Sequence, residues 1–104
     1  MKRRSRSCQK ALLVGGKLVE SVNVMGLANI VGKSRSTILR YERTGVFPSA
    51  PFRLGEHRYY PLTLAKRLVP LVARIPSHTS PAPELLVEIN RLFNEETNRY
   101  AGKE

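Results

Sequence analysis

The sequence predicts a mainly α-helical fold with a small β-wing, followed by a separate amphipathic helix. Gly32, Lys33 and Ser34 form a turn between two short helical segments, with the length and composition that join the helices of a helix-turn-helix. A basic segment centred on Gly55 and closed by two tyrosines follows, which is typical of a hairpin. Beyond a proline-rich stretch, apolar residues recur at helical spacing through residues 84–100.

The composition of the chain favours some classes of binding partner and argues against others. The chain has 104 residues and a formal net charge of +10, so we expect one domain with appendages that binds nucleic acid or another anionic surface. Apolar residues make up 41% of the chain, which suits a small core rather than an enclosed active-site cleft. The chain contains no Asp and no carboxylate cluster, so we expect no enzyme. Four Tyr and three Phe, without Trp, argue against a platform that stacks single-stranded bases.

The numbers and positions of cysteine and histidine indicate the cellular compartment and argue against a bound metal. The single cysteine, Cys8, has no partner for an internal disulfide, which predicts a reducing, cytoplasmic environment. His57 and His78 lie far from each other and from Cys8, without metal-ligand spacing, so we expect neither a metal nor another cofactor. No stretch approaches the roughly 18 apolar residues that a membrane span requires.

The N-terminal region divides into a basic arm and a short segment rich in apolar residues. Residues 1–10 hold five cations and no apolar cluster, which predicts a disordered arm. Arg3 and Arg4 of this arm are candidates for contact with phosphates or a minor groove, and a solvated terminus is the alternative. In residues 11–22, alternating apolar positions around Gly15 and Gly16 favour a hairpin, with a broken helix as the alternative.

Capping residues define the helix pair. Asn23 is the predicted N-cap of a helix over residues 24–31 that ends at Gly32, and Ser34 caps a second helix over residues 35–43. Ile38 is expected to face the first helix, which leaves the polar side chains of the early turns outside. In a helix-turn-helix these early residues contact base edges, and Arg can bind guanine O6 and N7 with two hydrogen bonds.

The wing follows a helix stop. Gly45 ends the second helix, Pro48 prevents it from resuming, and Phe47 and Phe52 are expected to fill the core beneath the turn. Residues 53–60 are then predicted to form a two-stranded ribbon that turns at Gly55–Glu56. Its His57 is expected to be a polar residue at the tip of the wing or a phosphate contact, rather than a metal ligand or a catalytic base. The candidate DNA-binding residues are Lys33, Arg35, Ser36, Thr37, Arg40, Tyr41, Arg43, Arg53, His57 and Arg58, with Arg3 and Arg4 of the arm.

Three short motifs in order carry a family resemblance. SRSTI at 34–38, GVFP at 45–48 and RLG at 53–55 resemble the AlpA family of small phage and prophage regulators, whose domain is a MerR-like winged helix-turn-helix. The resemblance covers about residues 22–75 and implies a transcriptional regulator or an excisionase. The chain departs from the family pattern by its N-terminal extension, by a C-terminal helix, and by Tyr60 where a Trp is usual. The effector-sensing half of MerR proteins is absent, so no small-molecule effector is implied.

The predicted domain, residues 11–75, ends in a helix. Residues 61–75 have a helical apolar stripe, with a kink or break expected at Pro70. Three cations on the outer face of this helix are further candidates for phosphate contact. They are Lys66, Arg67 and Arg74.

A proline-rich joint, residues 76–83, separates this domain from an amphipathic helix in residues 84–104. The stripe of that helix consists of Leu85, Leu86, Ile89, Leu92 and Phe93. It is buried either on the domain or against a second copy, and the joint makes us favour a homodimer.

Charge, motifs and resemblance together predict sequence-specific binding of double-stranded DNA, by a transcriptional regulator or excisionase of a phage or mobile element. The alternative is a DNA-recruiting assembly protein, such as a small terminase subunit or partition protein, that oligomerises through its C-terminal helix. An RNA-binding protein is a weaker alternative, since neither an RNP-like aromatic motif nor a GXXG loop is present.

Overall fold

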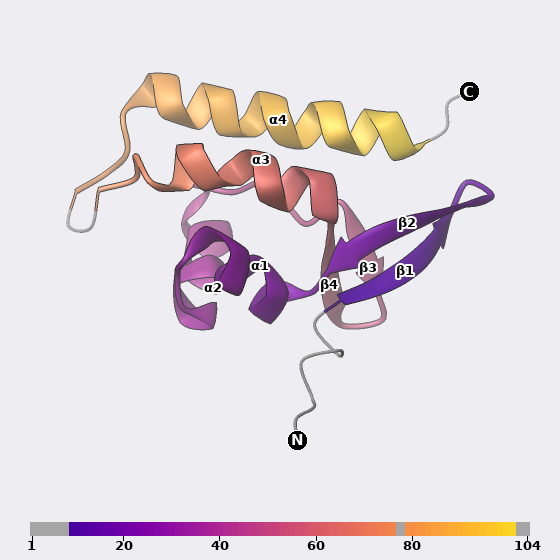
Figure 1. Cartoon of the computed structure of the whole chain (residues 1–104). Helices are drawn as coiled ribbons and strands as arrows, with labels where there is room; N and C mark the ends of the chain where they lie inside the picture. Colours follow the sequence, from indigo (N-terminus) through magenta and orange to yellow (C-terminus); the bar gives the residue numbers. More distant parts are fainter. Residues whose placement is uncertain (1–8, 77–78, 102–104) are drawn as a thin grey trace.

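A computed structural model describes residues 9–76 and 79–101 of the chain. These residues form a mixed α+β domain in which four helices pack with a four-stranded antiparallel sheet of order β1-β2-β4-β3 (Figure 1). The elements in chain order are β1 (Gln9–Val14), β2 (Lys17–Val22), α1 (Val24–Val31), α2 (Arg35–Thr44), β3 (Phe52–Leu54), β4 (His57–Pro61), α3 (Leu62–Val72) and α4 (Pro83–Ala101). The expectation of a mainly α-helical chain is corrected, because β1 and β2 extend the small predicted ribbon into a larger sheet.

The N-terminal segment is a hairpin, as the glycine pair predicts, and the broken-helix alternative is wrong. Gly15 and Gly16 have φ values of 56° and 85°, the left-handed conformations that a two-residue turn between twisted strands requires. β2 then pairs with β4 through Ser21 opposite Pro61 and Val22 opposite Tyr60. β1 begins two residues inside the predicted arm. The rest of the arm, with Arg3 and Arg4, lies outside the described residues.

The caps of α1 and α2 are confirmed. The Asn23 side chain accepts a hydrogen bond from the Gly26 N–H at 2.9 Å, and Ser34 Oγ accepts one from the Thr37 N–H at 3.1 Å. Both helices end at left-handed glycines, Gly32 with φ 75° and Gly45 with φ 88°. The turn between α1 and α2 therefore has the predicted position and length.

The second hairpin turns at Gly55–Glu56 between β3 and β4, as predicted. Phe47 is buried, which confirms its place in the core. Phe52 is only half-buried and lies edge-on to Tyr100, with 6.1 Å between ring centroids, so its expected place in the core is wrong. Phe52 instead links the edge strand β3 to the end of α4.

Helix α3 continues through Pro70 and ends at Val72, so the proline does not break it. Pro70 is exposed in the last turn, where it removes one hydrogen bond, the one that this position would donate to the Lys66 carbonyl, and only two helical residues follow it. The interior side of α3 is apolar, with Leu64, Leu68 and Val72 fully buried. A proline in the last turn, on the exposed side of α3, therefore leaves the buried side of the helix continuous.

Helix α4 folds back and lies along α3, on the side of α3 turned away from α1 and α2 (Figure 1). Leu85, Ile89, Leu92 and Phe93 are buried, and the Phe93 ring lies 5.3 Å from the Phe47 ring between centroids. The amphipathic stripe is thus covered within the chain. This corrects our preference for the stripe as a homodimer interface and confirms the alternative, packing on the domain.

Tyr60 supplies a test of this core at alkaline pH. Burial, with a smaller contribution from the negative charge of Glu42, raises the pKa of Tyr60 to about 12 from an ordinary value near 10. Because the folded state keeps the phenol protonated longer than the unfolded chain does, its contribution to the free energy of unfolding is complete below pH ~10 and is lost as the pH rises toward ~12. The full loss is about 3 kcal/mol above pH ~12, of which roughly half is expected by pH ~11.

The measurement is urea denaturation of the wild type and of Tyr60→Phe between neutral pH and pH ~11. The variant has no phenol to titrate at this position, so its stability should fall less steeply than that of the wild type. The two proteins share every other titratable group, which makes the difference between the two curves the informative quantity. Parallel curves would contradict the assigned pKa.

Candidate nucleic-acid interface

The first turn of α2 and the β3–β4 hairpin meet at one side of the domain. They line a hollow of about 100 Å³, with Arg35 from α2 and Glu56, His57 and Arg58 from the hairpin. Asn23 and the first residues of α1 complete its wall. The structure therefore joins two groups of predicted residues that are about twenty positions apart in the sequence.

The outer side of α2 carries most of the predicted base-reading residues. Ser36, Arg40 and Arg43 follow one another at spacings of four and three, so they share one side of the helix, and all three are exposed. Arg35 is exposed next to them at the start of the helix. Thr37 is half-buried and its hydroxyl lies 2.8 Å from Ser34 Oγ, so it serves the helix cap.

Tyr41 does not belong to this surface. It is buried, with its ring centroid 5.1 Å from that of Phe47, and burial raises its pKa. The predicted role of Tyr41 as a DNA contact is corrected to a role in the core. The spacing contains this signal, because Tyr41 follows the buried Ile38 by three positions and so lies on its side of the helix.

The hairpin has two exposed basic side chains and a third that forms an ion pair with α2, called the brace below. Arg53 and His57 are exposed, whereas Arg58 is half-buried and its Nε lies 2.5 Å from Glu42 Oε1 of α2. This ion pair ties the hairpin to the middle of α2. Sequence reasoning missed Glu42, although an isolated acid in a segment this basic already indicates a nearby cation.

The remaining predicted cations divide between this surface and the opposite side. Lys33 is half-buried in the turn between α1 and α2, where its N–H donates to the Ala28 carbonyl at 2.9 Å. Lys66 is exposed on α3, but Arg67 and Arg74 each form an ion pair with a glutamate of α4. These two arginines are therefore engaged within the chain rather than presented to phosphate.

The side formed by α2 and the hairpin has exposed cations on two elements and one exposed acid, Glu56. Exposed cations with few neighbouring acids are a feature that attracts phosphate oxygens. Across residues 9–76 and 79–101, no three His, Cys, Asp or Glu side chains gather closely enough to hold a metal ion. None of the helices described above has the length and apolarity to cross a membrane. No protein-family model, curated protein or solved structure matches this chain.

Proposed function

We propose that the protein binds double-stranded DNA sequence-specifically through a winged helix-turn-helix made of α1, α2 and the β3–β4 hairpin, as a transcriptional regulator or excisionase. One observation carries the proposal. Arg35 of α2 lines one hollow together with His57 and Arg58 of the hairpin, and the Arg58–Glu42 ion pair holds the two elements together there.

In this mechanism α2 lies in the major groove. Arg35, Ser36 and Arg40 reach base edges, and Arg43 contacts the phosphates that border the groove. Arginine recognises guanine through O6 and N7, and a serine hydroxyl accepts or donates to either base. Phosphate contacts set the affinity and the register on the duplex, and the base contacts set the preferred sequence.

The hairpin contacts the backbone or the adjacent minor groove through Arg53 and His57. Because Arg58 is paired with Glu42, the hairpin keeps a fixed distance from α2. A duplex that accepts α2 in its major groove then meets the hairpin at a set position. The brace thereby couples the two contacts without touching DNA itself.

A double-mutant cycle on Glu42→Gln and Arg58→Gln tests this brace. Removing one member leaves the other half-buried without its counter-charge, so each single variant is expected to lose about 1–3 kcal/mol of unfolding free energy. The double variant should lose less than the two singles together, with a coupling of about 1–2 kcal/mol in urea denaturation. Strict additivity would show that the two side chains do not interact.

The assembly alternative depended on an apolar stripe available for oligomerisation. In the structure Leu85, Ile89, Leu92 and Phe93 are buried within the chain, so this observation favours the regulator or excisionase. Homodimerisation remains a proposal of its own, to be supported by the number and spacing of half-sites on DNA.

Footprinting on DNA that flanks the gene of this protein, at two salt concentrations, tests the proposed function. We expect a discrete protected site, repeated as half-sites if two copies bind, with an affinity that falls steeply as salt increases. Uniform coating that salt abolishes, without a protected site, would contradict sequence-specific binding and favour an assembly role.

A further inference from the structure

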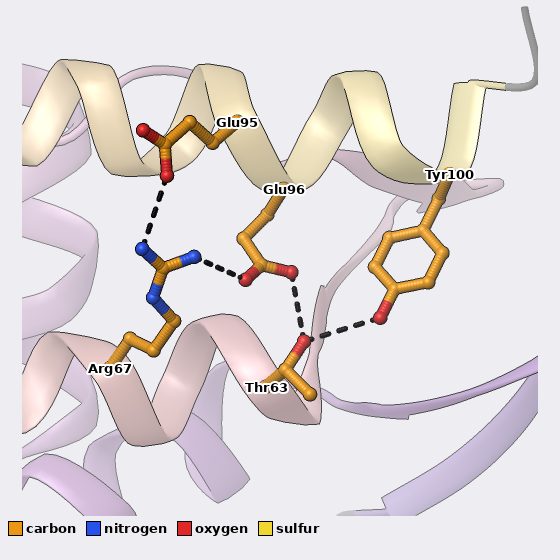
Figure 2. A network of polar contacts seen from close by, with 5 residues as sticks. All are labelled: Thr63, Arg67, Glu95, Glu96 and Tyr100. Atoms are coloured by element: carbon orange, nitrogen blue, oxygen red, sulfur yellow. Dashed lines mark hydrogen bonds and ion pairs between the residues drawn. The ribbon is translucent and has the colours of Figure 1, made fainter.

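Polar contacts between α3 and α4 centre on one arginine (Figure 2). Arg67 of α3 donates from Nη1 to Glu96 Oε2 at 2.9 Å and from Nη2 to Glu95 Oε1 at 3.1 Å. The other oxygen of Glu96 accepts a hydrogen bond from Thr63 Oγ1 at 2.8 Å, and Thr63 Oγ1 lies 3.2 Å from the Tyr100 hydroxyl. Both oxygens of this buried carboxylate therefore have a donor.

The pairing continues two helical turns away. Arg74 Nη1 donates to Glu88 Oε1 at 3.0 Å. Arg67 and Arg74 are seven residues apart on α3, and Glu88 and Glu95 are seven apart on the antiparallel α4, which is about two turns on each helix. The equal spacing on the two helices thus places a glutamate of α4 opposite each arginine of α3.

The two exposed ion pairs, Arg67–Glu95 and Arg74–Glu88, contribute little to holding α4 in place. The side chains of Arg74 and Glu88 are 57% and 49% exposed, and exposed pairs contribute at most about 1 kcal/mol. The buried stripe contributes more, at about 1.5–3 kcal/mol for each fully buried large apolar side chain. The main consequence of the pairing is therefore electrostatic: it neutralises arginines that would otherwise present unpaired charge to phosphate.

We propose that Glu88, Glu95 and Glu96 are specificity-determining residues for the DNA binding proposed above, on which this inference rests. By pairing with Arg67 and Arg74 they prevent the α3–α4 side from binding phosphates. That side is turned away from α2 (Figure 1), so a duplex held there is out of reach of the base-reading helix. Because non-specific sites compete with the specific one in large excess, silencing a second cationic surface raises the fraction of protein at its target.

The test is the affinity of Glu88→Gln/Glu95→Gln for a duplex without the target site, measured at several salt concentrations. The variant keeps Glu96 and the buried stripe. We expect roughly threefold tighter binding at low salt, and a plot of log K against log salt that steepens by about 0.9, because the variant frees Arg74 for one new phosphate contact while Arg67 stays paired with Glu96. Adding Arg67→Gln and Arg74→Gln to this variant should restore the wild-type slope.

The matched control is Glu20→Gln/Glu84→Gln, which makes the same change of net charge at two exposed positions that do not take part in the ion pairs of Arg67 and Arg74. Its slope should stay at the wild-type value, because no cation is released. A wild-type slope in Glu88→Gln/Glu95→Gln, or equal steepening in the control, would overturn the inference. Thermal unfolding of each variant shows whether the fold is intact.

Failure of this inference is distinguishable from failure of the proposed function. The role of the glutamates is tested by the salt dependence with which the variants bind non-specific DNA. The proposed function is tested by whether the wild-type protein protects a discrete DNA site. A footprint with unchanged slopes contradicts the inference alone, and the absence of any footprint contradicts the function on which it rests.

Discussion

Replacing both Arg35 and Arg40 by alanine is expected to weaken binding to the specific site by roughly 10²- to 10⁴-fold. Each arginine that binds a base edge contributes about 1–3 kcal/mol of discrimination, and the contributions of separate positions add approximately. Both residues are exposed, so their removal should leave the free energy of unfolding within about 0.5 kcal/mol of the wild-type value. The loss should therefore appear in DNA binding and not in stability.

Fluorescence anisotropy with the specific duplex and with a scrambled one measures the effect. The matched control is Lys66→Ala/Arg91→Ala, which removes two exposed cations from α3 and α4. This control should weaken both duplexes slightly and equally, through long-range electrostatics. If Arg35→Ala/Arg40→Ala loses specific and scrambled binding to the same extent, α2 does not read bases.

Phe93→Ala is expected to lower the free energy of unfolding by about 3–5 kcal/mol. Phe93 is 1% exposed, and its ring lies 5.3 Å from that of Phe47 and 6.4 Å from that of Tyr60 between centroids. The truncation leaves a cavity where α4 meets the α2–β3 connection and β4. Since a small domain is only marginally stable, a loss of this size unfolds a substantial fraction of the protein.

Urea denaturation of Phe93→Ala and of Val87→Ala tests this contact. Val87 lies on the same helix but is 57% exposed, so its truncation should change stability by less than about 0.5 kcal/mol. Similar small effects for both variants would show that α4 does not dock through its stripe.

Local signals in the sequence predict the helix boundaries well. Asn23 and Ser34 cap through side chains that bind their own helix, and Gly32 and Gly45 supply the left-handed conformation that ends one. Such interactions span three or four residues, so they can be recognised without knowing the fold. The glycine pair of the first hairpin is predicted for the same reason.

The placement of α4 could not be predicted from local signals. An amphipathic stripe shows that a helix must be buried, but it does not show against what. Here the surface that receives it includes Phe47 and Tyr60, which are more than thirty residues earlier in the chain. The pairing of β2 with β4 is equally non-local, and it is the reason why the sheet is larger than predicted.

The candidate surface is predicted in part. The exposed positions Arg35, Ser36 and Arg40 follow from the helical spacing around Ile38. The brace between Arg58 and Glu42 depends on how the hairpin lies against α2, which spacing within either element does not contain. The same holds for the arginines of α3, which appear available in the sequence until α4 is placed beside them.

Backbone amide chemical shifts, followed by NMR while a short duplex with the footprinted site is added, test the central claim most directly. We expect the largest changes on residues 33–43 and 53–58, and small changes along α3 and α4. Changes concentrated on the α3–α4 side or on the β1–β2 hairpin, with α2 unaffected, would contradict the assignment of the DNA-binding surface.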